Sequence, residues 1–168
     1  GTELAGIIDA IGPAVTRFRV GDEVIAFTGG RFGCHAEHRA LAEDGMIALK
    51  PTNLSFEEAA SLSFGAMNAL PFLRDRARIG RGDHVLVVGA SGAVGTAAVQ
   101  IAKHFGAEVT GVTSTGNAAL VQSIGADRVI DYTKVDFATA GETWDIIIDT
   151  TGTVPFSRCE MSLKPGGP

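Results

Sequence analysis

A glycine-rich turn at residues 89–95 (GASGAVG) is the part of the sequence whose residue types and spacing point most directly to chemistry. An apolar run precedes the turn and apolar residues at helical spacing follow it, which predicts a strand, a turn and a helix. In this context bare amides and the positive end of the helix can approach a pyrophosphate. Gly92 and Gly95 fit the second and third glycines of a dinucleotide-binding turn, and Ala90 stands in place of the first. The lysine and Ser/Thr pair of a P-loop is missing, so dinucleotide binding is favoured over nucleotide hydrolysis and over an ordinary tight turn.

The residues after the next predicted strand bear on which dinucleotide would bind. Residues 113–117 read TSTGN. An acidic residue there would accept from the adenosine ribose 2′-hydroxyl and select the unphosphorylated cofactor. Small donors without a carboxylate suit a 2′-phosphate better, although no Arg or Lys in this loop strengthens the preference. The sequence therefore favours NADP(H), with NAD(H) as the alternative.

Composition excludes several classes of protein. The chain has 168 residues, 45% of them hydrophobic, and a net charge of -5 from 14 basic and 19 acidic residues. This acidity gives no reason to expect nucleic acid or an anionic membrane as partner, and the four arginines between residues 74 and 81 are expected to be solvated at a helix end. The most hydrophobic window, residues 85–102, is interrupted by glycines and polar residues, which argues against a membrane span. Two cysteines favour a reducing, cytoplasmic compartment.

The order of elements changes along the chain. The first fifty residues predict an all-β piece of short segments, whereas Ser55 to Glu58 have the form of a capping box that opens a helical stretch to residue 73, which Pro71 should kink or split. After Gly82, apolar strands alternate with helices, which implies a parallel sheet with right-handed crossovers. The expected strands are residues 7–11, 23–27, 34–40, 46–49, 84–89, 108–113, 128–131 and 145–149, and the later helices are residues 94–105 and 117–124, ended by Gly106 and Gly125.

Several motifs together resemble the medium-chain dehydrogenase/reductase superfamily, on its zinc-free, quinone-oxidoreductase-like branch. They are GTELAG at residues 1–6, VGDEV at 20–24, SFEEAA at 55–60, the glycine turn, GADRVIDY at 125–132 and LKPGG at 163–167. The resemblance implies an α/β chain with a partial GroES-like β domain at residues 1–54. A partial Rossmann doubly wound parallel sheet, with its connecting helix, would follow at residues 55–168. It also implies that the chain is incomplete at both ends.

The resemblance also implies positions for cofactor-binding residues, but it indicates no catalytic residue. Asn68 takes the place of a threonine near the nicotinamide, and Tyr132 either lies near the adenine or covers a strand end. The residues expected to bind the cofactor are Asn68, then Ser91, Gly92, Ala93 and Val94 (at the pyrophosphate), Gly95 of the same turn, Ser114 and Asn117 (at the ribose or its phosphate), Tyr132, and Thr150 and Thr151 (after the fourth strand).

No metal is expected. Zinc-dependent relatives have histidine where this chain has Thr2, and a hydroxyl is a poor zinc ligand. They also carry a lobe of four cysteines, which is absent. Cys34 and His38 would share a helix face, but in the strand predicted there they would lie roughly 13 Å apart, too far for one ion.

The chemistry would then belong to the cofactor, with the chain providing orientation and electrostatics. The resemblance, together with the glycine turn and the missing zinc ligands, implies a zinc-independent oxidoreductase that transfers hydride from NADPH to a quinone or activated enone and acts on a small molecule as a homo-oligomer. An NAD(P)-dependent alcohol dehydrogenase-like enzyme is one alternative, and a non-catalytic nucleotide-binding protein is another for this chain by itself. The strand at residues 145–149, apolar on both faces, should promote association of the isolated chain.

Overall fold

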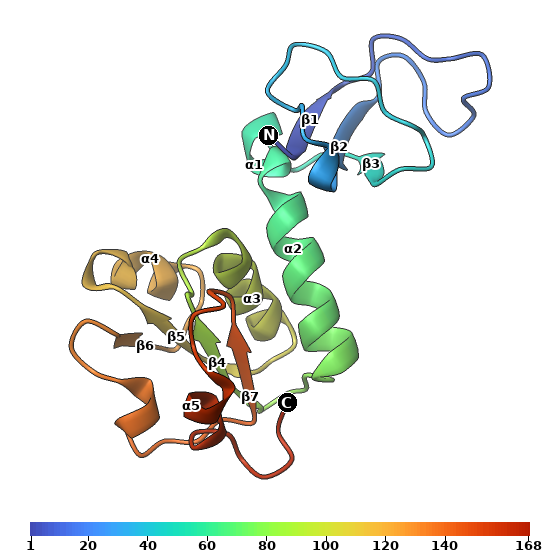
Figure 1. Ribbon diagram of the computed structural model, residues 1–168. Coiled ribbons are helices and arrows are strands. Elements are labelled where there is room, and N and C mark those ends of the chain that lie inside the picture. Colours follow the sequence, from blue (N-terminus) through green and yellow to red (C-terminus); the bar gives the residue numbers. More distant parts are fainter. The chain divides into compact units, whose positions relative to one another are not determined.

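The computed structural model describes residues 1–168, which divide into two compact units, Gly1–Phe64 and Gly65–Pro168 (Figure 1). Each unit has its own sheet, and each is described by itself.

The first unit is built on a three-stranded antiparallel sheet in the order β1-β2-β3. These strands are β1 (Glu3–Ile7), β2 (Glu23–Phe27) and β3 (Ile47–Leu49), and a short 3-10 helix η1 (Gly29–Arg31) follows β2. Val24 and Ala26 are buried from alternate positions of the central strand, as expected for a sheet with one covered face. The predictions for residues 23–27 and 46–49 are thereby confirmed.

Two strand predictions in this unit are wrong. The first strand lies at Glu3–Ile7 and not at residues 7–11, because its partner β2 begins at Glu23, which pairs with Ile7, and leaves the following residues without a ladder. Residues 34–40 form no strand. All of them except Cys34 are exposed, so no buried alternate face holds an extended conformation there.

The helical stretch begins at the predicted capping box. The backbone N–H of Glu58 donates to Ser55 Oγ (3.2 Å), and the Ser55 N–H donates to Glu58 Oε2 (2.9 Å), which satisfies two amides at the start of the helix. The helices are α1 (Phe56–Ala60), α2 (Leu62–Leu70) and the wider turn η2 (Pro71–Arg76), in which the Ala77 N–H donates to the carbonyl of Phe72. The predicted split at Pro71 is therefore confirmed.

The second unit contains a parallel four-stranded sheet in the order β6-β5-β4-β7. The chain moves outward from β4 to β5 and β6 and then returns to the other side of β4, so the strand order reverses beside β4. The strands are β4 (His84–Val88), β5 (Glu108–Thr113), β6 (Arg128–Asp131) and β7 (Ile146–Asp149); the helices are α3 (Ala93–His104), η3 (Thr115–Asn117), α4 (Ala118–Ser123), η4 (Phe137–Thr139) and α5 (Phe156–Glu160). All four strand predictions and both helix predictions are confirmed to within one residue at each end.

Both faces of this sheet are covered. Val85 and Val87 of β4 pack in one apolar cluster with Val99 of α3, whereas Leu86 and Val88 pack in a second cluster with Trp144 and Cys159. Successive side chains of a strand point to opposite faces, so helices lie on both sides of the sheet, as Figure 1 shows for α3 and α5. This is the doubly wound arrangement that the apolar strands predicted.

The close approach of α3 to the end of β4 generates a prediction about stability. A Cβ atom at Gly95 would lie 2.1 Å from the carbonyl oxygen of Gly89 and 2.8 Å from the Cα of Ala90. Gly95→Ala should therefore lower the free energy of unfolding by about 3 kcal/mol, as overpacking against backbone does. Gly92→Ala is the matched control, because its Cβ would meet no atom closer than 3.4 Å, and it should cost less than about 1 kcal/mol. Denaturant unfolding measures both variants, and equal losses would contradict this packing argument.

Candidate dinucleotide-binding site

The turn after β4 is held by backbone hydrogen bonds. The N–H groups of Gly89 and Ala90 both donate to the carbonyl of Val112 on β5 (3.1 and 3.0 Å), and the Gly92 N–H donates to the Gly89 carbonyl (3.0 Å). Gly89 has a φ of +77°, and a Cβ there would lie 2.7 Å from Thr150 Oγ1. Gly89, next to the expected position at Ala90, is thus the residue whose conformation requires glycine in the tight turn.

The N-terminus of α3 presents backbone donors without internal partners. The first helical bond runs from the Thr96 N–H to the Gly92 carbonyl (2.8 Å), so the amides of Ala93, Val94 and Gly95 precede the helical ladder. No side chain caps this end and no acidic residue lies in its first turn.

Gly92 shows why this end suits an anionic ligand. Its φ is −78°, which any residue can adopt, and a Cβ there would clash with no other atom of the protein. No contact within the chain therefore requires glycine at residue 92. A ligand that approaches the backbone from outside does require it, because a side chain there would stand in the way. Gly92 and Ala93 are both exposed. The residues present therefore fit the pyrophosphate of a dinucleotide.

Polar side chains from three segments meet beside this turn. Ser91 Oγ accepts from Thr113 Oγ1 (2.9 Å) and from Asn117 Nδ2 (3.3 Å), and the same amide nitrogen lies 3.4 Å from Ser114 Oγ. Because a hydroxyl can accept two hydrogen bonds and donate one, Ser91 keeps its own proton available for a ligand. The structure thus brings together three predicted residues, Ser91, Ser114 and Asn117. The structure adds Thr113 to this group. Its position as the last residue of a predicted strand could have identified it from the sequence.

The remaining predicted residues lie around the same edge of the sheet. Thr150 Oγ1 donates to the carbonyl of Val88 (2.8 Å), and Thr151 Oγ1 donates to Asp149 Oδ1 (2.6 Å). These bonds hold both threonines against the turn, where a Cβ at Gly89 would meet each of them. Tyr132 follows β6, and its backbone N–H donates to the Thr113 carbonyl (3.1 Å) while its side chain is exposed.

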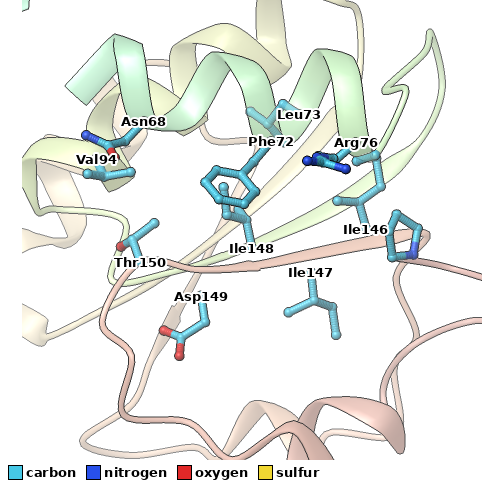
Figure 2. A pocket seen from close by; sticks show the side chains of 12 residues that line it. Asn68, Phe72, Leu73, Arg76, Val94, Ile146, Ile147, Ile148, Asp149 and Thr150 are labelled. Carbon is cyan, nitrogen blue, oxygen red and sulfur yellow. The ribbon is translucent and has the colours of Figure 1, made fainter. Parts of the chain in front are cut away.

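A cavity of about 340 Å³ lies between η2 and β7. Figure 2 shows Asn68, Val94 and Thr150 at one end of it and Arg76 toward the other. Isoleucines of β7 and the side chains of Phe72 and Leu73 make most of the wall apolar. The structure therefore brings three predicted site residues from distant parts of the sequence to one cavity.

The segment that held the possible metal ligands is not a strand, so the 13 Å strand spacing does not apply to it. Its side chains contact different neighbours: Cys34 Sγ lies 3.4 Å from Thr28 Oγ1, and His38 Nδ1 lies 2.7 Å from Asp9 Oδ2. No group of three or more His, Cys, Asp or Glu side chains is placed to hold a metal ion.

No helix has the length and apolar character needed to cross a membrane.

A parallel sheet whose order reverses beside a glycine turn at a helix N-terminus defines a Rossmann-type dinucleotide-binding unit. Comparison with known proteins agrees, because residues 93–168 match the family described as "Zinc-binding dehydrogenase". The chain is 40% identical over 99% of its length to a 2-methylene-furan-3-one reductase of Solanum lycopersicum, of which it covers 44%. It is 36% identical over 98% of its length to an NADPH-dependent alkenal/one oxidoreductase, chloroplastic, of Arabidopsis thaliana, of which it covers 43%.

Solved structures give the same relationship. The quinone oxidoreductase from Coxiella burnetii matches 99% of this chain and 53% of its own, with a TM-score of 0.89 and 32% identity. Over almost its whole length the chain is similar to quinone-oxidoreductase-like members of the medium-chain dehydrogenase/reductase superfamily. The predicted order of a GroES-like β unit and a Rossmann unit is confirmed. The chain spans about half the length of the curated relatives it matches.

The geometry at Gly92 separates binding from stability. Gly92→Ala should weaken binding of a nicotinamide dinucleotide by at least about tenfold, because a methyl group would keep the pyrophosphate from the amides of α3. The melting temperature should change little. Fluorescence titration together with thermal unfolding measures both quantities. Unchanged affinity in a folded Gly92→Ala protein would show that the pyrophosphate does not lie at this turn.

Proposed function

We propose that the protein is an NADPH-dependent, zinc-independent oxidoreductase that acts on a quinone or an activated enone. The observation that carries the proposal is the outward-facing bare backbone at Gly92, next to the unpaired amides of α3 at the reversal of the parallel sheet. The names of the relatives support the reaction class, since they include reductases of enones and quinones. When bound, the nicotinamide ring supplies the hydride.

In this proposal the chain's residues bind and orient. The amides of Ala93, Val94 and Gly95 hold the pyrophosphate, with the hydroxyl of Ser91 as a further donor. Ser114 and Asn117 contact the adenosine ribose and its phosphate, and Tyr132 lies at the adenine. The side chains of Asn68, Val94, Thr150 and Thr151 line the part of the site nearest the nicotinamide.

The preference for NADP(H) over NAD(H) rests on the polar cluster at the end of β5. Ser114 and Asn117 can donate to a phosphate, and their loop contains no carboxylate of its own. A 2′-phosphate carries nearly two negative charges at neutral pH, so donors without opposing charge favour it. NAD(H) remains the second cofactor to be compared.

Thr2 bears on whether the reaction needs zinc. It stands where zinc-dependent relatives have histidine, which supports a zinc-independent reaction although the matched family is described as zinc-binding.

The proposal also covers the location and assembly of the protein. We propose a cytoplasmic homo-oligomer with a small-molecule substrate and without nucleic-acid or membrane partners; the Arabidopsis relative is named chloroplastic. We also propose residues 1–54 as the GroES-like domain and residues 55–168 as the Rossmann domain with its connecting helix.

Cofactor preference is tested by one substitution. The unmodified protein should bind NADPH more tightly than NADH, and Ser114→Asp should reverse or flatten that order by repelling the 2′-phosphate. Ser114→Asn is the matched control, since it changes size without adding charge. Equal titration curves for both cofactors in the unmodified protein would refute the preference.

Metal independence is tested by removal. Elemental analysis should find less than stoichiometric zinc, and chelators should leave the rate of NADPH oxidation with a quinone or enone unchanged. A panel that also contains alcohols separates this activity from that of an alcohol dehydrogenase. Activity that chelation abolishes and zinc restores would mean that the reaction depends on a metal.

A further inference from the structure

A carboxylate outside the predicted site lies at the same edge of the sheet. Asp131 is the last residue of β6, and its side chain is 16% exposed. Oδ1 accepts from the backbone N–H (3.0 Å) and the hydroxyl (2.7 Å) of Thr133. Oδ2 accepts from the hydroxyl of Thr115 and lies 3.1 Å from Nζ of Lys134. A carboxylate offers about four acceptor positions, so these four donors occupy Asp131 completely.

This saturation decides what Asp131 can do for a nucleotide. An acidic residue that selects the unphosphorylated cofactor must accept from the ribose 2′-hydroxyl, and Asp131 has no free position for that bond. The hydroxyls of Thr115 and Thr133 hold the pKa of its carboxyl well below the usual range, so the group stays ionised. Asp131 is therefore a fixed negative charge close to Thr115, the neighbour of Ser114, and would repel a 2′-phosphate unless it is balanced.

Lys134 provides the balancing charge. Its ammonium has three donors, of which one is directed at Asp131, and its side chain is 65% exposed. Lys134 and Thr115 contact the same oxygen of Asp131, so the ammonium lies beside the loop that holds Ser114. The backbone bond from Tyr132 to the carbonyl of Thr113 ties the segment that carries Lys134 to the end of β5 (3.1 Å).

We propose that Lys134 is a specificity-determining residue for nucleotides that carry a 2′-phosphate. Its ammonium, positioned by Asp131, neutralises that carboxylate and donates its free N–H groups to the phosphate. Asp131 is a positioning residue that acts through Lys134 and Thr115. This inference rests on the proposed binding of NADP(H) and assigns the cation that the loop at residues 113–117 itself lacks.

The test compares dissociation constants for NADPH and NADH in the purified protein. Lys134→Gln should weaken NADPH binding about tenfold, as expected for the loss of one charge-assisted hydrogen bond, and change NADH binding by less than about twofold. Lys134→Arg should retain most of the NADPH affinity. Asp131→Asn added to Lys134→Gln should recover part of the loss, because the unbalanced negative charge is then gone. Lys164→Gln is the matched control. Lys164 forms a similar ion pair with Asp145 (2.8 Å), which lies just before the start of β7 at the opposite edge of the sheet. This variant should leave the ratio of the two dissociation constants unchanged.

The outcomes separate this inference from the proposed function. If Lys134→Gln weakens the binding of NADPH and NADH equally, or weakens neither, Lys134 does not recognise the 2′-phosphate. A double variant no better than Lys134→Gln would refute the charge balance with Asp131. An unmodified protein that binds both nucleotides equally would contradict the proposed NADPH preference, yet a selective loss of NADPH binding in Lys134→Gln would still support the role of Lys134.

Discussion

The whole site is built around the contact between the start of α3 and the end of β4. The Gly95 backbone approaches the Gly89 carbonyl so closely that a single methyl group would not fit. This approach directs the free amides of α3 to the carboxyl edge of the sheet, and the sharp turn at Gly89 leaves room for Thr150 and Thr151. Without it, the helix end and the threonines after β7 would not share one edge. Gly89 and Gly95 are therefore needed both for the packing of α3 on β4 and for the position of the binding groups.

Hydrogen bonding at that edge divides the polar groups into two kinds. Asp131 is occupied by donors from its own loop and by Thr115 of the neighbouring loop, and Asp149 accepts from donors of its own loop, so both carboxylates shape the loops and fix negative charge. The amides of α3 and the hydroxyl of Ser91 keep donors that no internal partner uses. The free donors at the turn suit a phosphate-rich ligand. The fixed negative charge of Asp131 opposes such a ligand, which gives Lys134 its significance as a local counter-charge.

The sequence predicted the second unit better than the first. Apolar strands such as residues 108–113 are buried on both faces, so their pattern is strong and local. In the first unit, the position of β1 depends on its pairing with Glu23 of β2, and residues 34–40 have no buried face; neither fact is local to the sequence. Individual site residues followed the glycine spacing and the family resemblance. Thr113 is noted in the sequence only among the small donors at residues 113–117, and no sequence pattern singles out Asp131 or Lys134. Their importance comes from contacts between neighbouring loops, which the register of β5 against β6 brings together.

In the proposed function, the N-terminus of α3 holds the pyrophosphate of the cofactor. A crystal structure of the protein soaked with NADPH tests this placement. We expect pyrophosphate oxygens about 3 Å from the backbone nitrogens of Ala93 and Val94, with the cofactor backbone passing over Gly92. A cofactor bound with its pyrophosphate elsewhere, and only water at these amides, would refute a binding role for this helix end.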